Sequence, residues 1–297
     1  MTKKRRLSMA QKRSLTGWAF LSVASLLIIV MSFYPLVRAF LLSLQTGIGV
    51  NLQRANPVYV NFQRVFIDTH FRQTIFNTFF YLIVQVPIML MLALVLASML
   101  NSPGLKFKGV FRTAIFLPCA VGLVAYAVIF RQMFMNFGLI NTILVNLGIF
   151  ETNYNFLGNA WSARFVIVIG LLWRWTGFNM VFYLAGLQNI DRSIYEAAEI
   201  DGANALQRFF SITIPQLRPI ILLTAILSTN GTLQMVDESM NLTLGGPGIA
   251  TRTMSHHIFV TAFEGAPNFG YAAAMSFVIF VFVAVLALIQ MKVGDKR

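Results

Sequence analysis

Four carboxylates lie close together in a polar stretch that separates two strongly apolar segments. They are Asp191, Glu196, Glu199 and Asp201. A helix this short is marginal in water unless another contact holds it, so we expect a partner protein. Asp201 would lie near the end of the helix and oppose its dipole, which also favours an outside contact. An ordinary connecting loop, in which Glu196 only caps its own helix, explains these residues equally well.

Local signals around these acids predict two short helices joined by a glycine. Ser193 stands three residues before Glu196, which is the spacing of a capping box. Gly202 can adopt the left-handed conformation that ends a helix. A second helical segment over 205–213 is then stopped or kinked by Pro215. One face of that segment carries Leu206, Phe209, Phe210 and Thr213.

A second chemically active group is an arginine inside an apolar segment, with tryptophans on both sides. Arg174 lies between Trp173 and Trp175. Central placement of an arginine in a membrane costs roughly 2.5–3.5 kcal/mol on insertion scales, so Arg174 should face a water-filled path or an acid. The alternative is an anchor of aromatic and arginine side chains at the membrane interface.

A third group combines hydroxyl and thioether side chains. Ser228, Thr232 and Met235 recur at four- and three-residue intervals, so a helix would present them on one face. Polar residues inside a span usually face a cavity. Packing between helices, which favours small hydroxyl residues, is the alternative.

Asp237 and Glu238 follow this group and have three interpretations. They could pair with Arg174, bind substrate hydroxyls, or mark the outer end of the span, and the last is favoured. His256 and His257 are expected at the surface, because no nearby carboxylate completes a metal site. The sequence contains neither a phosphate-binding P-loop nor a nucleophile–base pair, so the chain itself should not bind ATP or catalyse a reaction.

The composition of the chain indicates which class of fold holds these residues in place. Of the 297 residues, 57% are hydrophobic and 11% are charged, and the mean hydropathy is +0.71. Soluble domains average about 25% charged residues, so the chain is predicted to cross a membrane several times. The net charge of +13 could suggest nucleic acid binding, but the basic residues flank apolar segments and indicate topology instead. The single cysteine, Cys119, excludes an internal disulfide.

Six segments have the roughly 20 apolar residues that a spanning helix needs. They cover residues 15–44, 74–100, 110–130, 163–187, 219–240 and 268–291. Residues 132–150 also lack charge, but they hold three asparagines and two glycines. We interpret that segment as an external interfacial or re-entrant one. The fold class is therefore an all-α membrane protein with six transmembrane helices.

The distribution of basic residues predicts the orientation. The basic tail at 1–14 leads into an apolar run that is too long for a signal peptide. With both termini cytoplasmic, the inner side holds this tail, the loop 188–218 and the tail 293–297. Lysine and arginine are then enriched inside, as the positive-inside rule expects. One membrane domain over 15–292 is predicted.

The acidic stretch resembles a known motif. Glu196, Ala197, Ala198 and Gly202, followed by Ile212 and Ile214-Pro215, resemble the "EAA" motif E-A-A-x3-G-x9-I-x-L-P of ABC importer permeases, with Ile214 replacing leucine. The resemblance implies a type I importer permease architecture. It also implies that this helix docks on an ATPase subunit, with Glu196 and Asp201 in the coupling region and Gly202 as its elbow.

Further segments resemble the maltose-type and multiple-sugar branch of these importers. They are "WRWTGFNMVFYLAGLQNI" at 173–190, "LGGPG" at 244–248, "FGYAAAMSF" at 269–277 and "RTAIFLPCAV" at 112–121. The resemblance implies that Arg174, Trp175 and Phe178, together with Ser228, Thr232 and Met235, line the sugar path. Family members carry more amide groups on the matching part of the fifth span.

The resemblance also implies a set of partners in a prokaryotic plasma membrane. These are a second permease, two ATPase subunits that hold ATP and Mg²⁺, an extracellular or periplasmic sugar-binding protein and membrane lipid, with no nucleic acid. The chain itself needs no cofactor and no metal. The alternatives are an importer of an acidic sugar, a polyol or glycerol phosphate and, from other classes, a channel or an intramembrane enzyme.

Overall fold

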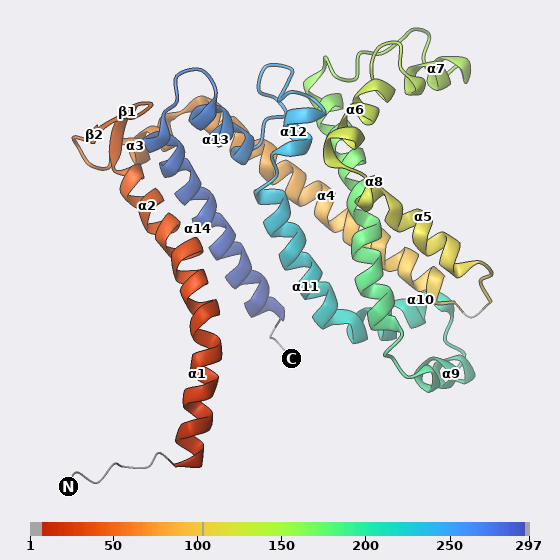
Figure 1. The fold of residues 1–297 in the computed structure, drawn as a ribbon. Coiled ribbons are helices and arrows are strands. Elements are labelled where there is room, and N and C mark those ends of the chain that lie inside the picture. The colour runs from red at the N-terminus through yellow and green to blue at the C-terminus, as the bar shows by residue number, and fades with distance from the viewer. Residues whose placement is uncertain (1–7, 103, 295–297) are drawn as a thin grey trace.

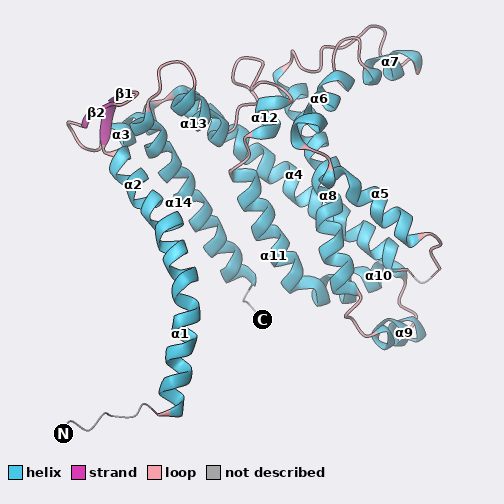
Figure 2. Ribbon diagram, viewed as in Figure 1, coloured by secondary structure: helices cyan, strands magenta, loops and turns pink. Residues whose placement is uncertain are grey.

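The computed structural model describes residues 8–102 and 104–294, with the side chains of residues 11 and 12 left out. Half of the predicted tail 1–14 and most of the tail 293–297 lie outside this part of the chain. Long helices run roughly side by side, most short elements gather at one end, and two short helices lie at the other (Figure 1). Helices account for nearly all the regular structure (Figure 2).

Five helical segments are long and apolar enough to cross a membrane. They are Arg13–Ser43, Thr69–Asn101, Ala160–Leu187, Ala205–Leu233 and Phe269–Gly294. These confirm five of the six predicted spans, with shifted boundaries. The second, third and fifth of these segments are α4, α8 and α14, which have the same bounds. The first joins α1 (Met9–Ile28) to α2 (Tyr34–Ser43) through a π-helical turn at Ile29–Phe33.

The predicted single helix at 110–130 is wrong in shape. Two helices, α5 (Lys108–Ala120) and α6 (Leu123–Met133), meet there at 96°. Pro118 lies in the last turn of α5, and the backbone of Val121 and Gly122 is extended, so the helix cannot continue. At 1.5 Å per residue α5 is about 20 Å long, which is less than the hydrocarbon core of a bilayer.

The short elements at the outer end connect the long helices. They are β1 (Gln45–Ile48), β2 (Asn51–Arg54), α3 (Val60–Ile67), α7 (Leu139–Asn146), α12 (Asp237–Asn241) and α13 (Met254–Phe263). The short hairpin of β1 and β2 stands beside helices throughout the described residues, and the predicted all-α membrane class is confirmed. Helix α7 is too short to span, as predicted for 132–150. It lies at the opposite end from the loop 188–218 and the end of α14, as the predicted topology requires (Figure 1).

Two glycines allow close approach to α8. A Cβ on Gly177 would lie 2.0 Å from the carbonyl oxygen of Ile115, so α8 and α5 touch through their backbones. A Cβ on Gly186 would lie 2.3 Å from Ile220 Cδ1 and 2.7 Å from Leu217 Cδ2 on the fifth span. Gly177 therefore requires a residue without a side chain, whereas at Gly186 a Cβ would displace the ends of two flexible side chains.

Asp68 joins the start of α4 to α14, and we expect its loss to destabilise the fold. Its Oδ1 accepts hydrogen bonds from the backbone nitrogens of His70 (2.8 Å) and Phe71 (3.3 Å), and its Oδ2 accepts one from Tyr271 Oη (2.6 Å). Asp68→Ala should cost about 2 kcal/mol or more, because it removes a helix cap and leaves a buried hydroxyl unpaired. Thermal unfolding in detergent measures the loss. Tyr271→Phe should cost less, and equal losses for the two variants would contradict the capping role.

Candidate coupling helix and translocation cavity

The acidic stretch forms helix α9 (Arg192–Ile200), but its start differs from the prediction. Asp191 is the N-cap, and its side chain accepts from the backbone nitrogen of Ser193 at 3.0 Å. The predicted capping box of Ser193 and Glu196 is therefore wrong. The helix begins one residue before Ser193, and Glu196 instead pairs with Arg192 one turn earlier, at 3.2 Å.

The end of α9 confirms the predicted glycine elbow. Gly202 has φ of +80°. Its nitrogen donates to the carbonyl of Glu199 (3.1 Å), and the nitrogen of Ala203 donates to the carbonyl of Ala198 (2.9 Å). This pair of bonds is the Schellman closure, which needs a left-handed residue at this position. Asp201 is the last residue before the elbow.

Two side-chain links tie α9 to the start of the fifth span. The first is an ion pair between Glu199 Oε2 and Arg208 Nη1 at 2.9 Å, and the second joins the hydroxyls of Tyr195 and Thr213 at 3.0 Å. Arg208 belongs to α10 (Ala205–Arg208), which has its own capping box at Asn204. These two contacts connect α9 directly to the segment that begins the fifth span.

The fifth span continues through its proline without a break. A π-helical turn at Phe209–Thr213 connects α10 to α11 (Ile214–Leu233). Pro215 is the second residue after this π-helical turn, so its missing N–H falls at the junction between the π-helical turn and α11. Of the two predicted effects of Pro215, the stop is wrong, while a π-helical turn does distort the helix just before it. Residues Ala205–Leu233 form one helical segment that runs from the neighbourhood of α9 to the cavity described below.

The acids of α9 face solvent, and so do apolar neighbours. The side chain of Glu196 is 61% exposed. Ile200 is 87% exposed and Leu206 is 68% exposed. Large apolar side chains that stay exposed beside acids are typical of a surface that binds another protein.

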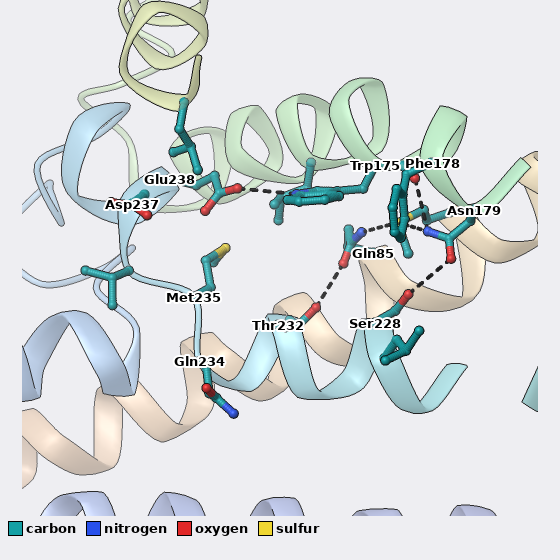
Figure 3. Close-up of a pocket in the computed structure, with 16 residues that line it drawn as sticks. Gln85, Trp175, Phe178, Asn179, Ser228, Thr232, Gln234, Met235, Asp237 and Glu238 are labelled. Atoms are coloured by element: carbon teal, nitrogen blue, oxygen red, sulfur yellow. Dashed lines mark hydrogen bonds between the residues drawn. The ribbon is translucent and has the colours of Figure 1, made fainter. Parts of the chain in front are cut away.

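A cavity of about 370 Å³ lies between α4, α8, α11 and α12 (Figure 3). Five of the six residues predicted to line a substrate path lie in its wall: Trp175, Phe178, Ser228, Thr232 and Met235. The indole of Trp175 and the phenyl ring of Phe178 meet edge to face, with centroids 5.9 Å apart. Met235 lies just beyond the end of α11 and still reaches the wall.

The sixth residue, Arg174, does not line this cavity. Its Nη1 donates to the carbonyl oxygen of Val121 at 2.8 Å, in the break between α5 and α6. Its guanidinium carbon lies 5.2 Å from the ring centroid of Tyr126 and 5.4 Å from that of Trp175. The arginine is buried and supports the wall from outside the cavity.

Glu238 faces the cavity, contrary to the favoured interpretation of a boundary residue. It is 5% exposed, and its Oε1 accepts from Trp175 Nε1 at 3.4 Å. Burial raises the pKa of its carboxyl above the usual range, although the bond from Trp175 opposes this. The reason is the chain path. Helix α11 ends at Leu233, and α12 turns Asp237 and Glu238 back toward the wall.

Two amides in the helices of the wall were missed by the sequence interpretation, as was Gln234 directly after α11. Gln85 comes from α4 and Asn179 from α8. Asn179 follows Trp175 by four residues, so the helical spacing already places both on one face. Gln85 carries a signal too, because it is a polar residue inside an apolar span.

The expectation that both histidines lie at the surface is wrong for His256. It is 3% exposed, and its Nδ1 lies 2.8 Å from Ser239 Oγ. Helix α13 packs this face inward. Burial, reinforced by Arg252, lowers the pKa of His256 to about 4, so the ring is neutral at neutral pH. Across the described residues, no three His, Cys, Asp or Glu side chains lie close enough to bind a metal ion.

Comparison with known sequences gives consistent matches. A family model described as "Binding-protein-dependent transport system inner membrane component" matches residues 69–296. The lactose transport system permease protein LacF of Rhizobium radiobacter is 46% identical over 98% of this chain and 98% of its own. The trehalose/maltose transport system permease protein MalF of Thermococcus litoralis is 34% identical over 94% of each chain.

Comparison with solved structures gives the same fold. A crystal structure of a bacterial ABC transporter involved in the import of the acidic polysaccharide alginate contains a chain with a TM-score of 0.82 and 22% identity, over 96% of both chains. A second structure holds the alginate transporter in complex with an alginate pentasaccharide-bound periplasmic protein. One of its chains has a TM-score of 0.76, covering 98% of this chain and 96% of its own. The architecture is that of a type I importer permease.

Proposed function

The chain belongs to the family of binding-protein-dependent transport system inner membrane components, and from this membership we propose how its residues take part in transport. It is a transmembrane permease subunit of an ATP-driven carbohydrate importer, a transport subunit rather than an enzyme. Its place is a prokaryotic plasma membrane. Helix α9 lies on the cytoplasmic side, and the cavity lies toward the outer end of the bundle.

The link between α9 and the fifth span carries the proposal for coupling. Glu196 presents an exposed acid to the ATPase, while Ala197 and Ala198 leave a small surface that a groove can accept. Glu199 and Tyr195 fix the helix to the segment that becomes α11. Closure of the ATPase would therefore move α11 as one body and change access to the cavity, which is alternating access about a fixed site.

The cavity is the proposed sugar site. Trp175 and Phe178 supply flat apolar surfaces for the C–H face of a sugar ring. Ser228, Thr232 and the two amides supply hydrogen bonds for its hydroxyls. A few polar groups placed in a mainly apolar pocket are typical of small-ligand sites, and the volume lies at the lower end of their usual 300–1,000 Å³.

The proposed partners follow from the roles of α9 in coupling and of the cavity in sugar binding. A second permease would complete the path, and two ATPase subunits would hold ATP and Mg²⁺ at the inner face. A sugar-binding protein would deliver the substrate outside, as the alginate importer binds a periplasmic protein.

Purification and transport assays test the function together. We expect an ATPase and a second six-span permease to co-purify with the tagged chain. In liposomes, that complex with its binding protein should take up a labelled neutral disaccharide only when ATP is present inside. Flux without ATP would indicate a channel and contradict the proposal. A labelled polyol, glycerol phosphate or acidic sugar, taken up in place of the neutral one, would identify an alternative substrate class.

A further inference from the structure

The cavity wall carries acids and lacks cations. Asp237 and Glu238 are its charged residues, and no lysine, arginine or histidine lines it among the residues that the structure describes. Neither acid forms an ion pair within that part of the chain. The charge of Arg174 acts on Glu238 from behind the wall, but its Nη1 is bonded to the carbonyl of Val121 and it does not line the cavity.

Glu238 is fixed in place and points toward the rings (Figure 3). One oxygen accepts from the indole of Trp175 at 3.4 Å. A buried carboxyl normally has a cation or several donors around it, because an unpaired one is costly to desolvate. A ligand with several hydroxyl groups would supply the missing donors, and hydrogen bonds to a carboxylate are among the stronger ones.

Several polar groups of the wall have weak partners, although Asn179 Nδ2 also donates to the Trp175 carbonyl at 3.0 Å. Gln85 Nε2 donates to the thioether of Met89, and Thr232 Oγ1 lies 3.4 Å from Gln85 Oε1. Ser228 Oγ lies 3.5 Å from Asn179 Oδ1. Thioethers are poor acceptors and bonds near 3.5 Å are long, so these groups can exchange their present partners for sugar hydroxyls at little cost.

An acidic sugar would lose solvent here without gaining a cationic partner in the wall, and the carboxylate of Glu238 would repel it. Its carboxylate would also face Asp237, and like charges in one site repel. We propose that this cavity selects neutral saccharides and that Glu238 is the residue that excludes acidic ones. This rests on the proposed function, because the cavity must be the sugar site.

Competition binding tests the selectivity directly. The full transporter complex is placed in nanodiscs without its binding protein, so that only the membrane subunits choose the ligand. A tritium-labelled neutral disaccharide is displaced either by itself or by a disaccharide of equal size that carries one uronic acid. For the wild type we expect the uronate to compete at least about tenfold more weakly, given the size of like-charge penalties at binding sites.

Three variants sharpen the test. Glu238→Gln keeps the shape and should strengthen uronate competition by about tenfold, with a smaller effect on the neutral sugar. Glu238→Asp keeps the acid and should retain discrimination. Glu264→Gln, an exposed acid outside the cavity, should leave both ligands unchanged. The melting temperature of each variant establishes that it is folded.

The outcomes separate the two proposals. Equal competition by the two disaccharides in the wild type would overturn the selectivity, and so would an unchanged ratio in Glu238→Gln. Either result leaves the proposed function as a carbohydrate importer standing if the complex still takes up labelled sugar with ATP. A complex that takes up no sugar at all would instead overturn the proposed function.

Discussion

Replacing Glu196 with lysine is expected to abolish sugar uptake while ATP hydrolysis continues. The exposed carboxylate would become a cation at the surface proposed to dock on the ATPase. Like charges placed opposite each other at an interface cost several kcal/mol, so uptake should fall by at least about tenfold. Uptake and ATPase rate, measured in the same liposomes, give the ratio that reports coupling. Stimulation of the ATPase by the binding protein should also be lost.

Arg192→Ala is the matched control for this variant. Arg192 is the intrachain partner of Glu196 at 3.2 Å, and both side chains are largely exposed. Exposed pairs of this kind contribute little, about 0.3–0.5 kcal/mol. Uptake by Arg192→Ala should therefore stay near that of the wild type. Normal uptake by Glu196→Lys, or equal losses in both variants, would count against a docking role for the acid.

Replacing Gly177 with alanine is expected to damage the fold itself. The added Cβ would meet the carbonyl oxygen of Ile115 at 2.0 Å and the Cα of Phe116 at 3.0 Å. These are backbone atoms, which cannot rotate away as a side chain can. Overpacking costs about 1–3 kcal/mol and occasionally more, and this contact belongs at the upper end. The melting temperature in detergent should drop by several degrees, with less protein recovered in the membrane.

The control variant Gly17→Ala distinguishes the effect of the steric clash from the effect of replacing a helical glycine. Gly17 also lies in a helix, but a Cβ there meets nothing within 4 Å. Alanine is the better helix former by roughly 0.5–1 kcal/mol, so this variant should be at least as stable as the wild type. A Gly177→Ala protein that melts at the wild-type temperature would show that α5 can move away from α8.

The long helices could be predicted from the sequence because their signals are local. Apolar runs of sufficient length identified five spans, and Gly202 identified the end of α9. The predicted helix at 110–130 failed because its apolar run hides a bend. Proline and glycine are frequent in transmembrane helices. Neither Pro118 nor Gly122 alone therefore indicates a turn of 96°.

The cavity was predicted only in part, since it depends on contacts between segments far apart in the chain. Trp175 and Thr232 could be assigned from spacing and resemblance. Glu238 could not, because its orientation depends on where α11 ends and how α12 turns. For Arg174, the sequence indicated that a partner was needed but not which one. An arginine in a span must be satisfied, but the sequence does not say that a carbonyl in the bend near Val121 would satisfy it.

The close contact at Gly186 has a mechanical consequence. Leu217 and Ile220 press against this glycine near the inner end of α11, whereas Thr232 lies at the other end, about 20 Å away at 1.5 Å per residue. If α11 rotates as a rigid helix about this contact, its two ends move in opposite directions. Pulling the inner end toward the centre would push the outer end outward, so a single rotation would close one gate as it opens the other.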